Sequence, residues 1–302
     1  MDASPTLDAR LMRTLAALLL ALVPLAALAQ SPTPPAPAAA PIARPRPQLP
    51  IPLQPNLPTI FLVGDSTVRN GKGDGGGGQW GWGEPLVHFF DLARVNVTNR
   101  ALGGRSSRTY ITEGLWAETL ALIKPGDVVL IQFGHNDGGP TPEIIRARGS
   151  LDGTGEQSEE VENPFTHQTE TVHSFGWYLR KYVQDVRAKH ATPILCTLVP
   201  RKLWKDGHIE RNTGTYAGWT RQVAETEKVP LLDLNELIAR RYDALGPEKV
   251  EELFADPHTH TSLKGAELNA EVVVSALKTL APNPVTNSFA PQATRIAPAP
   301  AN

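Results

Sequence analysis

The chain begins its folded part with the stretch TIFLVGDST, residues 59–67. Its apolar run predicts a buried β-strand, and Gly64 ends that strand. A small hydroxyl residue, Ser66, follows at once. In an open α/β sheet, functional groups gather at the carboxyl ends of the strands. Ser66 is therefore a possible nucleophile, although Gly-Asp-Ser is also a common turn or helix N-cap.

Strand-like and helix-like segments alternate along the rest of the chain, which is typical of a parallel sheet covered on both faces. Further strands are predicted at 95–100, 127–133, 193–199 and 229–233, and helices at about 80–90, 173–189, 216–227 and 263–280. The sequence therefore predicts a five-stranded parallel sheet between helices. Residues 140–172 are polar with little periodicity, which favours a functional lid or rim.

Both ends of the chain differ in composition from this central part. Residues 1–29 carry an apolar run and an Ala-Leu-Ala cleavage pattern, which predict a signal peptide and hence a secreted or periplasmic protein. An uncleaved anchor is the alternative. Residues 30–58 are rich in Pro and Ala and are predicted to be a linker. Residues 59–281 form the predicted folded domain, and 282–302 a Pro-rich disordered tail.

Charge and cysteine content limit the partners of the chain. It has 29 Lys and Arg against 31 Asp and Glu, a formal net charge of −2. This balance argues against nucleic-acid binding, and no basic run suggests a membrane partner after signal cleavage. The single cysteine, Cys196, lies in an apolar run and is expected to be a buried hydrophobic residue. An exported chain without an intrachain disulfide fits a bacterial periplasmic or secreted enzyme.

Polar residues also follow later strands, at positions that could complete a catalytic site. Gly104 follows the second predicted strand and Asn136 the third, while Asp256 and His260 precede the last helix. This Ser…Asp…His order predicts a serine activated by His260, with Asp256 orienting the imidazole. The Ser66 N–H, the Gly104 N–H and the Asn136 side chain are the expected donors to an oxyanion.

Four blocks in order resemble the GDSL or SGNH hydrolase superfamily, with Ser66, Gly104, Asn136 and His260 at the signature positions. Stretches at 101–108, 173–180 and 258–266 are similar to the rhamnogalacturonan acetylesterase group. The resemblance implies a three-layer α/β/α sandwich of flavodoxin-like type around a five-stranded parallel sheet. It also implies removal of acetyl groups from plant polysaccharide, without metal or cofactor. We expect a monomer whose partner is an acetylated polysaccharide or oligosaccharide.

One position departs from the family pattern. The family usually places its acid three residues before the catalytic histidine, where this chain has Pro257; Asp256 lies four before His260. We expect the longer loop still to bring Asp256 to His260. The alternatives are His258 as the base, or a dyad without a working acid. A zinc site at His258 and His260 lacks a third ligand at recognisable spacing.

Substrate contacts are predicted from aromatic and histidine residues near the motifs. These are Trp80, Trp82, His135, Trp204 and His258. Tryptophans beside a cleft often stack on sugars, but core or lid packing is an equal alternative for Trp80 and Trp82. Two other functions remain open. One is a lipase or phospholipase of the same superfamily, and the other is a non-catalytic carbohydrate-binding module.

Overall fold

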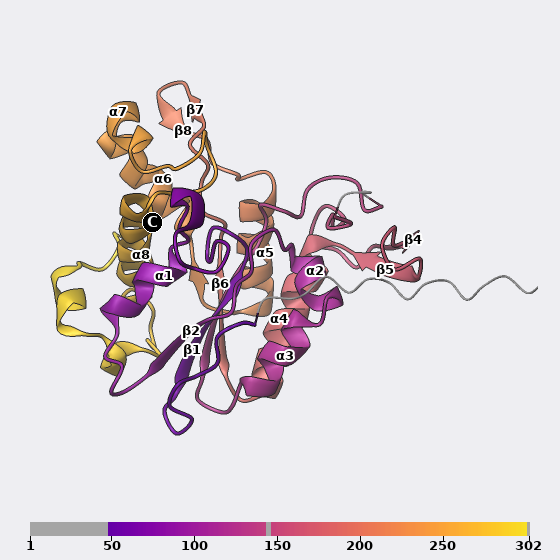
Figure 1. The fold of residues 1–302 in the computed structure, drawn as a ribbon, viewed down its shortest axis with the longest axis horizontal. Helices are drawn as coiled ribbons and strands as arrows, with labels where there is room; N and C mark the ends of the chain where they lie inside the picture. The colour runs from indigo at the N-terminus through magenta and orange to yellow at the C-terminus, as the bar shows by residue number, and fades with distance from the viewer. Residues whose placement is uncertain (1–47, 143–145, 301–302) are drawn as a thin grey trace, which may run out of the picture. The chain divides into compact units, whose positions relative to one another are not determined.

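The computed structural model describes residues 48–142 and 146–300; the predicted signal peptide and residues 30–47 of the predicted linker lie outside them. Five strands form one sheet in the order β2-β1-β3-β6-β9, with every pair parallel (Figure 1). They are β1 (Thr59–Gly64), β2 (Asn96–Asn99), β3 (Val128–Gln132), β6 (Thr192–Cys196) and β9 (Leu231–Leu232). The predicted five-stranded parallel sheet is confirmed.

Alternation of side chains along the central strands divides the core into two layers. Ile60 and Leu62 pack into one cluster, whereas Phe61 and Val63 pack into the other. Because successive strand residues point to opposite faces, an apolar run must be covered on both sides. Figure 1 shows α1, α6 and α8 on one side of the sheet and α2, α3, α4 and α5 on the other. The result is the predicted α/β/α arrangement.

The helices that cover the first face are α1 (Gly83–Leu86), α6 (Leu234–Leu245), α7 (Pro247–Glu251) and α8 (Leu263–Leu277). The second face is covered by α2 (Ser107–Thr112), α3 (Leu115–Leu122), α4 (Phe175–Ala188) and α5 (Tyr216–Glu227). A 3-10 turn, η2 (Val87–Phe89), continues α1. The helix predicted at about 80–90 is therefore shorter than its sequence suggests.

The order of the strands places a crevice between β1 and β3. The chain leaves β1 toward α1 on one face, and after β3 it reaches α4 on the other face. The two loops therefore diverge at the carboxyl ends of neighbouring strands. Open α/β sheets bind ligands at this type of switch point. Ser66 and Asn136 belong to these two loops.

Residues 140–172 contain a hairpin that the sequence does not predict. The strands β4 (Ser158–Glu162) and β5 (Thr169–His173) pair antiparallel, and the hairpin extends from the side of α2 (Figure 1). A second, smaller hairpin joins β7 (Trp204–Lys205) to β8 (His208–Ile209). Most side chains of β4 and β5 are exposed. Val172 is the one buried side chain in these two strands, so there is no hydrophobic alternation by which to recognise them.

The prediction of a disordered tail is wrong for residues 282–300. Two 3-10 helices, η3 (Thr286–Ser288) and η4 (Pro291–Arg295), lie in this segment. Val285 and Ala293 are buried in the core beside α8, and the Phe289 ring stacks on Phe90 with a centroid distance of 5.3 Å. Proline favours the first turn of a helix, so a Pro-rich composition did not prevent local structure here.

The end of the predicted linker is also packed. Leu49 is buried in the core layer of α2 to α5, and Arg100 donates a hydrogen bond of 2.9 Å to the carbonyl of Pro50.

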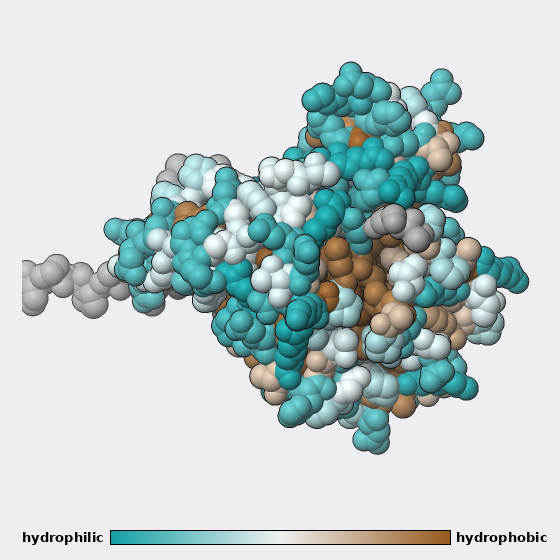
Figure 2. Space-filling view, turned by 180° about the vertical axis from the view of Figure 1, so that it is seen from behind, coloured by the Kyte–Doolittle hydropathy of each residue, from teal (hydrophilic) through white to brown (hydrophobic). Residues whose placement is uncertain are grey.

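The face shown in Figure 2 is mostly hydrophilic, with hydrophobic residues gathered in one hollow near its middle. Within the described residues, no helix has the length and apolar character needed to cross a membrane.

Candidate active site

Ser66 lies in a tight turn directly after β1. A side chain at Gly64 would meet the Gln132 carbonyl at 2.6 Å, so only glycine allows β1 and β3 to approach this closely. The Asp65 carbonyl accepts the N–H of Arg69 at 3.0 Å, which closes the turn. Ser66 is only 8% exposed. The strand end and the turn together hold the Ser66 hydroxyl at the mouth of the crevice.

A chain of hydrogen bonds joins Ser66, His260 and Asp256. The Nε2 atom of His260 lies 2.9 Å from Ser66 Oγ, and its Nδ1 atom lies 2.5 Å from Asp256 Oδ2. Asp256 Oδ1 accepts the backbone N–H groups of His258, Thr259 and His260 at 3.0, 2.7 and 3.0 Å. The chain thus wraps around one carboxylate, and this bend brings Asp256 to His260 despite the four-residue spacing.

The charge of Asp256 fixes the tautomer of His260. Partial burial raises the pKa of Asp256, but hydrogen bonds from the Thr259 and His260 N–H groups and the His260 ring outweigh it and lower the pKa to about 2. An ionised carboxylate can only accept hydrogen bonds. The proton of the neutral ring therefore lies on Nδ1, and Nε2 is left to accept from the Ser66 hydroxyl.

Two of the three expected oxyanion donors are the backbone N–H groups of Ser66 and Gly104. Gly104 has a φ of +78°, a left-handed conformation that favours glycine. A Cβ added to its neighbour Gly103 would lie 3.4 Å from Ser66 Cβ, so this glycine pair passes close to the nucleophile. Among the described residues, the N–H groups of Ser66 and Gly104 have no hydrogen-bond partner. Both are available to an oxyanion.

The side-chain amide of Asn136 is held on both sides. Its Nδ2 donates to the Arg105 carbonyl at 3.0 Å, and its Oδ1 accepts from Arg148 Nη1 at 2.8 Å. An amide nitrogen carries two hydrogens. The second hydrogen is the one that could bind an oxyanion. Ser66, Gly104, Asn136 and His260 line the same cleft.

A buried carboxylate ties the loop after β3 to the start of α2. Asp137 accepts the Ser107 N–H at 2.9 Å, the Ser107 hydroxyl, and the Gly134 N–H at 3.0 Å. Burial raises the pKa of Asp137 to about 7 despite the Ser107 bonds, and nearby Asp65 adds to the rise. These bonds fix the loop that carries Asn136 against the segment that carries Gly104.

His135 lines the cleft around Ser66, although little of its side chain is exposed there. Its side chain is 3% exposed, and its Nδ1 lies 3.3 Å from Asp65 Oδ2. Asp65 also accepts the N–H and the hydroxyl of Thr67 at 2.8 and 2.7 Å. Burial raises the pKa of Asp65, but the charge of His135 and these hydrogen bonds lower it below its usual value. The pair links the first and third strand loops beneath the site.

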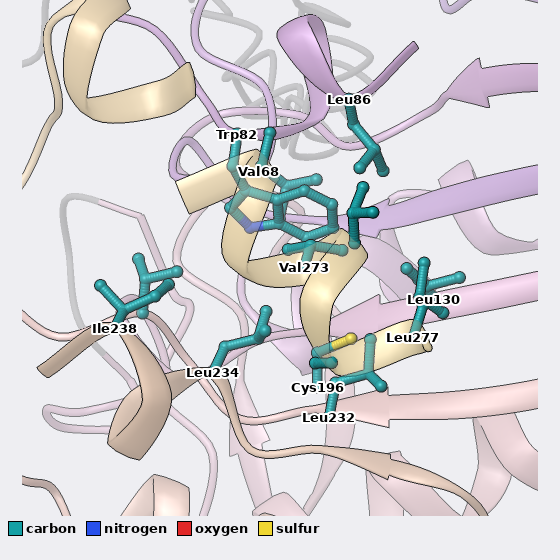
Figure 3. Close-up of a cluster of buried hydrophobic side chains, with 14 of the residues drawn as sticks. Val68, Trp82, Leu86, Leu130, Cys196, Leu232, Leu234, Ile238, Val273 and Leu277 are labelled. Atoms are coloured by element: carbon teal, nitrogen blue, oxygen red, sulfur yellow. The ribbon is translucent and has the colours of Figure 1, made fainter. Parts of the chain in front are cut away.

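The predicted tryptophan contact is wrong for Trp82. Its side chain is 1% exposed and donates to Gln132 Oε1 at 2.8 Å. Figure 3 shows the ring among Val68, Leu86 and Val273 in the core. The alternative of core packing is therefore the correct one. An indole whose N–H has a buried partner packs well in a core.

Three other predicted contacts are absent from the described lining of the cleft. Trp80, Trp204 and His258 are not among the described residues that line it. Trp80 pairs through its backbone with Thr261, at 2.9 Å from its N–H to the Thr261 carbonyl. Trp204 packs partly buried against the core. His258 is exposed, and its Nδ1 lies 2.7 Å from Thr259 Oγ1.

The cleft around Ser66 has a volume of about 1450 Å³ and a cationic lining. Among the described residues that line it, the five basic side chains are Lys72, Arg105, Arg146, Arg148 and Arg201, and the two acidic ones are Glu113 and Glu170. Both acids pair with arginines: Glu113 with Arg105 at 2.8 Å, and Glu170 with Arg108 at 2.7 Å. Within the described lining, the large apolar side chains are Leu102 and Phe165.

Sequence reasoning did not predict these cationic residues. Arg146 and Arg148 lie in the polar segment after β3, which carries no periodic pattern, and Arg201 follows β6. The sequence indicated these arginines only by their position, because both segments follow the carboxyl ends of predicted strands. Metal ligation finds no support in the part of the chain that the structure describes, where no three His, Cys, Asp or Glu side chains gather to hold an ion.

Known proteins with similar sequences include one rhamnogalacturonan acetylesterase and one probable rhamnogalacturonan acetylesterase. The chain is 32% identical over 235 residues to a probable rhamnogalacturonan acetylesterase of Bacillus subtilis, covering 76% of this chain and 96% of the relative. It is 29% identical over 219 residues to the rhamnogalacturonan acetylesterase of Emericella nidulans, covering 72% of this chain and 84% of that protein.

Among solved structures, the chain is similar to the Bacillus subtilis protein YxiM, with a TM-score of 0.59 and 30% identity. The match covers 74% of this chain but 56% of YxiM, so the chain spans about half the length of that protein. The GDSL-like lipase/acylhydrolase family matches residues 62–268, which include Ser66, Gly104, Asn136 and His260. The chain therefore belongs to the GDSL-like lipase/acylhydrolase family and is a GDSL-family esterase.

Proposed function

We propose that the chain is a secreted or periplasmic serine esterase that removes acetyl groups from a rhamnogalacturonan-type polysaccharide. The observation that carries the proposal is the hydrogen-bonded series Ser66, His260 and Asp256 at the edge of a cationic cleft. Secretion rests on the composition of residues 1–29 alone.

The proposed reaction begins at the Ser66 hydroxyl. Its oxygen attacks the acetyl carbonyl carbon while His260 Nε2, 2.9 Å away, accepts the hydroxyl proton. The carbonyl oxygen becomes an oxyanion that the Ser66 and Gly104 N–H groups and Asn136 Nδ2 stabilise. The ionised Asp256 stabilises the imidazolium that forms. Each of these groups acts more strongly on the transition state than on the bound ester.

Collapse of this intermediate breaks the bond between the acetyl carbon and the sugar oxygen. The imidazolium of His260 returns its proton to that oxygen, which leaves as a sugar hydroxyl and leaves an acetyl group on Ser66. Water then enters, gives a proton to the same Nε2 and attacks the acetyl carbon. A second tetrahedral intermediate releases acetate and restores the Ser66 hydroxyl.

The substrate class is supported by the relatives' names and by the charge of the cleft. A cluster of cationic side chains in a low-dielectric cleft concentrates anions and favours their approach. The uronate carboxylates of an acidic pectin would meet Arg146 and Arg201 there, whereas acetylated xylan offers few such groups. The described lining lacks the continuous apolar channel that a long acyl chain would need.

The test is acetate release from three acetylated polymers: rhamnogalacturonan, homogalacturonan and xylan. We expect the highest kcat/KM on rhamnogalacturonan, and a loss of preference between acidic and neutral polymers as salt screens the cleft. Ser66→Ala should release no acetate above background and should not be labelled by an organophosphonate. Retained turnover in Ser66→Ala would rule out the serine mechanism. Preference for long-chain acyl esters would instead favour a lipase.

A further inference from the structure

Arg148 contacts the side chain of Asn136, and a role in substrate binding does not explain this contact. Its Nη1 donates to Asn136 Oδ1 at 2.8 Å, on the opposite side of the amide carbon from the donor nitrogen. We propose that Arg148 is a positioning residue that orients and polarises the Asn136 amide for oxyanion binding. The inference rests on the proposed function, since it concerns how the same ester carbonyl is stabilised.

The first step is the orientation of the amide. The two ends of an asparagine side chain have nearly the same shape, so neighbouring hydrogen bonds decide which end points where. Arg148 can only donate, so it requires the oxygen of Asn136. The Arg105 carbonyl can only accept, so it requires the nitrogen at 3.0 Å. Together these contacts leave one N–H of Nδ2 directed away from both anchors.

The second step is the strength of the donor. A guanidinium on Oδ1 draws electron density toward the amide oxygen, which makes the Nδ2 hydrogens better donors. The oxyanion carries its charge only in the transition state and the tetrahedral intermediate. Polarisation through Asn136 therefore acts on kcat more than on KM. A neutral residue in place of Arg148 would keep the packing of the site but lose this effect.

The third step is the fixed position of Arg148 itself. The neighbouring Ser150 N–H donates to the Asp137 carbonyl at 2.9 Å, and the Gly149 carbonyl accepts from buried Arg108 at 2.8 Å. An added Cβ at Gly149 would lie 2.5 Å from the Gly139 carbonyl. Residues 149 and 150 therefore lie directly on the loop that carries Asn136. Because this backbone is firmly packed, the Arg148 guanidinium can hold the Asn136 amide in one orientation.

The experiment measures Arg148→Met and Arg148→Lys with p-nitrophenyl acetate, a small neutral ester that has no carboxylate for the cleft to bind. For Arg148→Met we expect kcat to fall about ten- to a hundredfold, as for loss of a charge-assisted hydrogen bond, with KM within about twofold. Arg148→Lys should retain an intermediate rate. Added guanidinium at sub-denaturing concentration should raise the rate of Arg148→Met more than that of the wild type.

A double-mutant cycle decides whether Arg148 acts through Asn136. In an Asn136→Ala background, Arg148→Met should change kcat by less than about twofold, because the intermediary amide is gone. An equal fold loss in both backgrounds would overturn the proposal, as would a rise in KM at unchanged kcat. Arg187→Met is the matched control: Arg187 lies on α4 and donates to the Glu227 carbonyl, so its kcat should stay at the wild-type value.

Two further readouts keep the outcomes distinct. Unfolding midpoints of the Arg148 variants within a few degrees of wild type are expected, and a kcat loss that tracks loss of folded protein would overturn a positioning role. If Ser66→Ala still hydrolyses the ester, the proposed function fails whatever Arg148→Met does. If Ser66→Ala is inactive and the cycle shows no coupling, only the role of Arg148 fails.

Discussion

His258 and His260 are separated by one residue but have different environments. His260 reaches Ser66 on one side and Asp256 on the other, at 2.9 and 2.5 Å. The His258 ring is exposed, and its Nδ1 lies 2.7 Å from Thr259 Oγ1. The bend around the Asp256 carboxylate turns one ring into the cleft and the other toward solvent. Sequence spacing alone left both histidines open as the base.

Substitution of each histidine by alanine tests this difference. We expect His260→Ala to lower kcat on an acetyl ester by about 10³-fold or more, because Ser66 then has no base. His258→Ala should stay within about threefold, since most surface substitutions perturb little. The comparison uses steady-state kinetics with p-nitrophenyl acetate. A larger loss in His258→Ala than in His260→Ala would show that the base is misidentified.

Asp256→Asn should affect both rate and stability. The rate should fall by about 10²- to 10⁴-fold, because a neutral amide neither fixes the tautomer nor stabilises the imidazolium. The folded-state pKa of about 2 lies below the ordinary 3.8, so ionised Asp256 stabilises the fold above about pH 4, and this is lost as pH falls through 2. Thermal unfolding should therefore show the wild type more stable at pH 6 and the two proteins converging near pH 2.

The hairpin β4–β5 is joined to α2 through one buried arginine. Arg108 forms two bonds to Glu170 at 2.7 and 2.8 Å, and its Nη1 donates to the Thr141 and Gly149 carbonyls, each at 2.8 Å. The Arg108 side chain is fully buried. Burial raises the pKa of Glu170, but the hydrogen bonds to Arg108 outweigh it and lower the value. The largely exposed hairpin thus depends on polar contacts at its base.

Arg108→Lys should loosen this element without removing a positive charge. A lysine cannot make the paired contact with Glu170 and leaves carbonyls without donors, so we expect a loss of about 3 kcal/mol in unfolding free energy. Urea denaturation measures the loss. Hydrogen exchange should rise in residues 158–173 before it rises in the sheet. Unchanged exchange in the hairpin would contradict the role of Arg108 as its anchor. Lys181→Arg, on the surface of α4, serves as a control.

The C-terminal segment is a structural part of the domain. Removal of residues 282–302 would expose the Phe90 ring and the apolar surface that Val285 and Ala293 cover. We expect a loss of at least about 2 kcal/mol in unfolding free energy, from burial of about one large and two small side chains. Chemical denaturation of the truncated protein checks this.

At the scale of the molecule, the site depends on the strand order. β1 and β3 are neighbours in the sheet although β2 lies between them in sequence. Their loops carry Ser66 and Asn136, while Asp256 and His260 enter from the segment before α8. These residues are up to 194 positions apart in sequence. A parallel sheet with crossovers on both faces is what brings them to one edge.

The core strands were predictable because each is buried on both faces. The run 59–64 and the run 128–132 contain mainly apolar residues, a signal that does not depend on distant contacts. The hairpin at 158–173 and the packed segment 282–300 gave no such signal. Their stability comes from contacts with residues far along the chain, such as Arg108 for the hairpin and Phe90 for the tail.

The same division holds within the site. Ser66, Gly104 and Asn136 follow predicted strands and His260 precedes the last helix, and the resemblance to the GDSL superfamily identified all four from sequence. Trp82 was misjudged because an indole suits a core and a sugar site equally well, and only its position against Gln132 decides between them. Arg148 had no motif. The role proposed for Arg148 follows from its contact with Asn136 Oδ1, which lies 12 residues away in sequence and 2.8 Å away in space.

The sequence by itself determined the five strands of the central sheet, the sheet type and the residue types of the hydrolytic set, because these follow from local hydrophobic runs and local motifs. Tertiary structure alone decided that Asp256 reaches His260, that Trp82 lies in the core and that arginines from separate loops share one cleft. Such outcomes depend on the direction of each side chain after packing. Direction is a property of the folded backbone, and no local pattern encodes it.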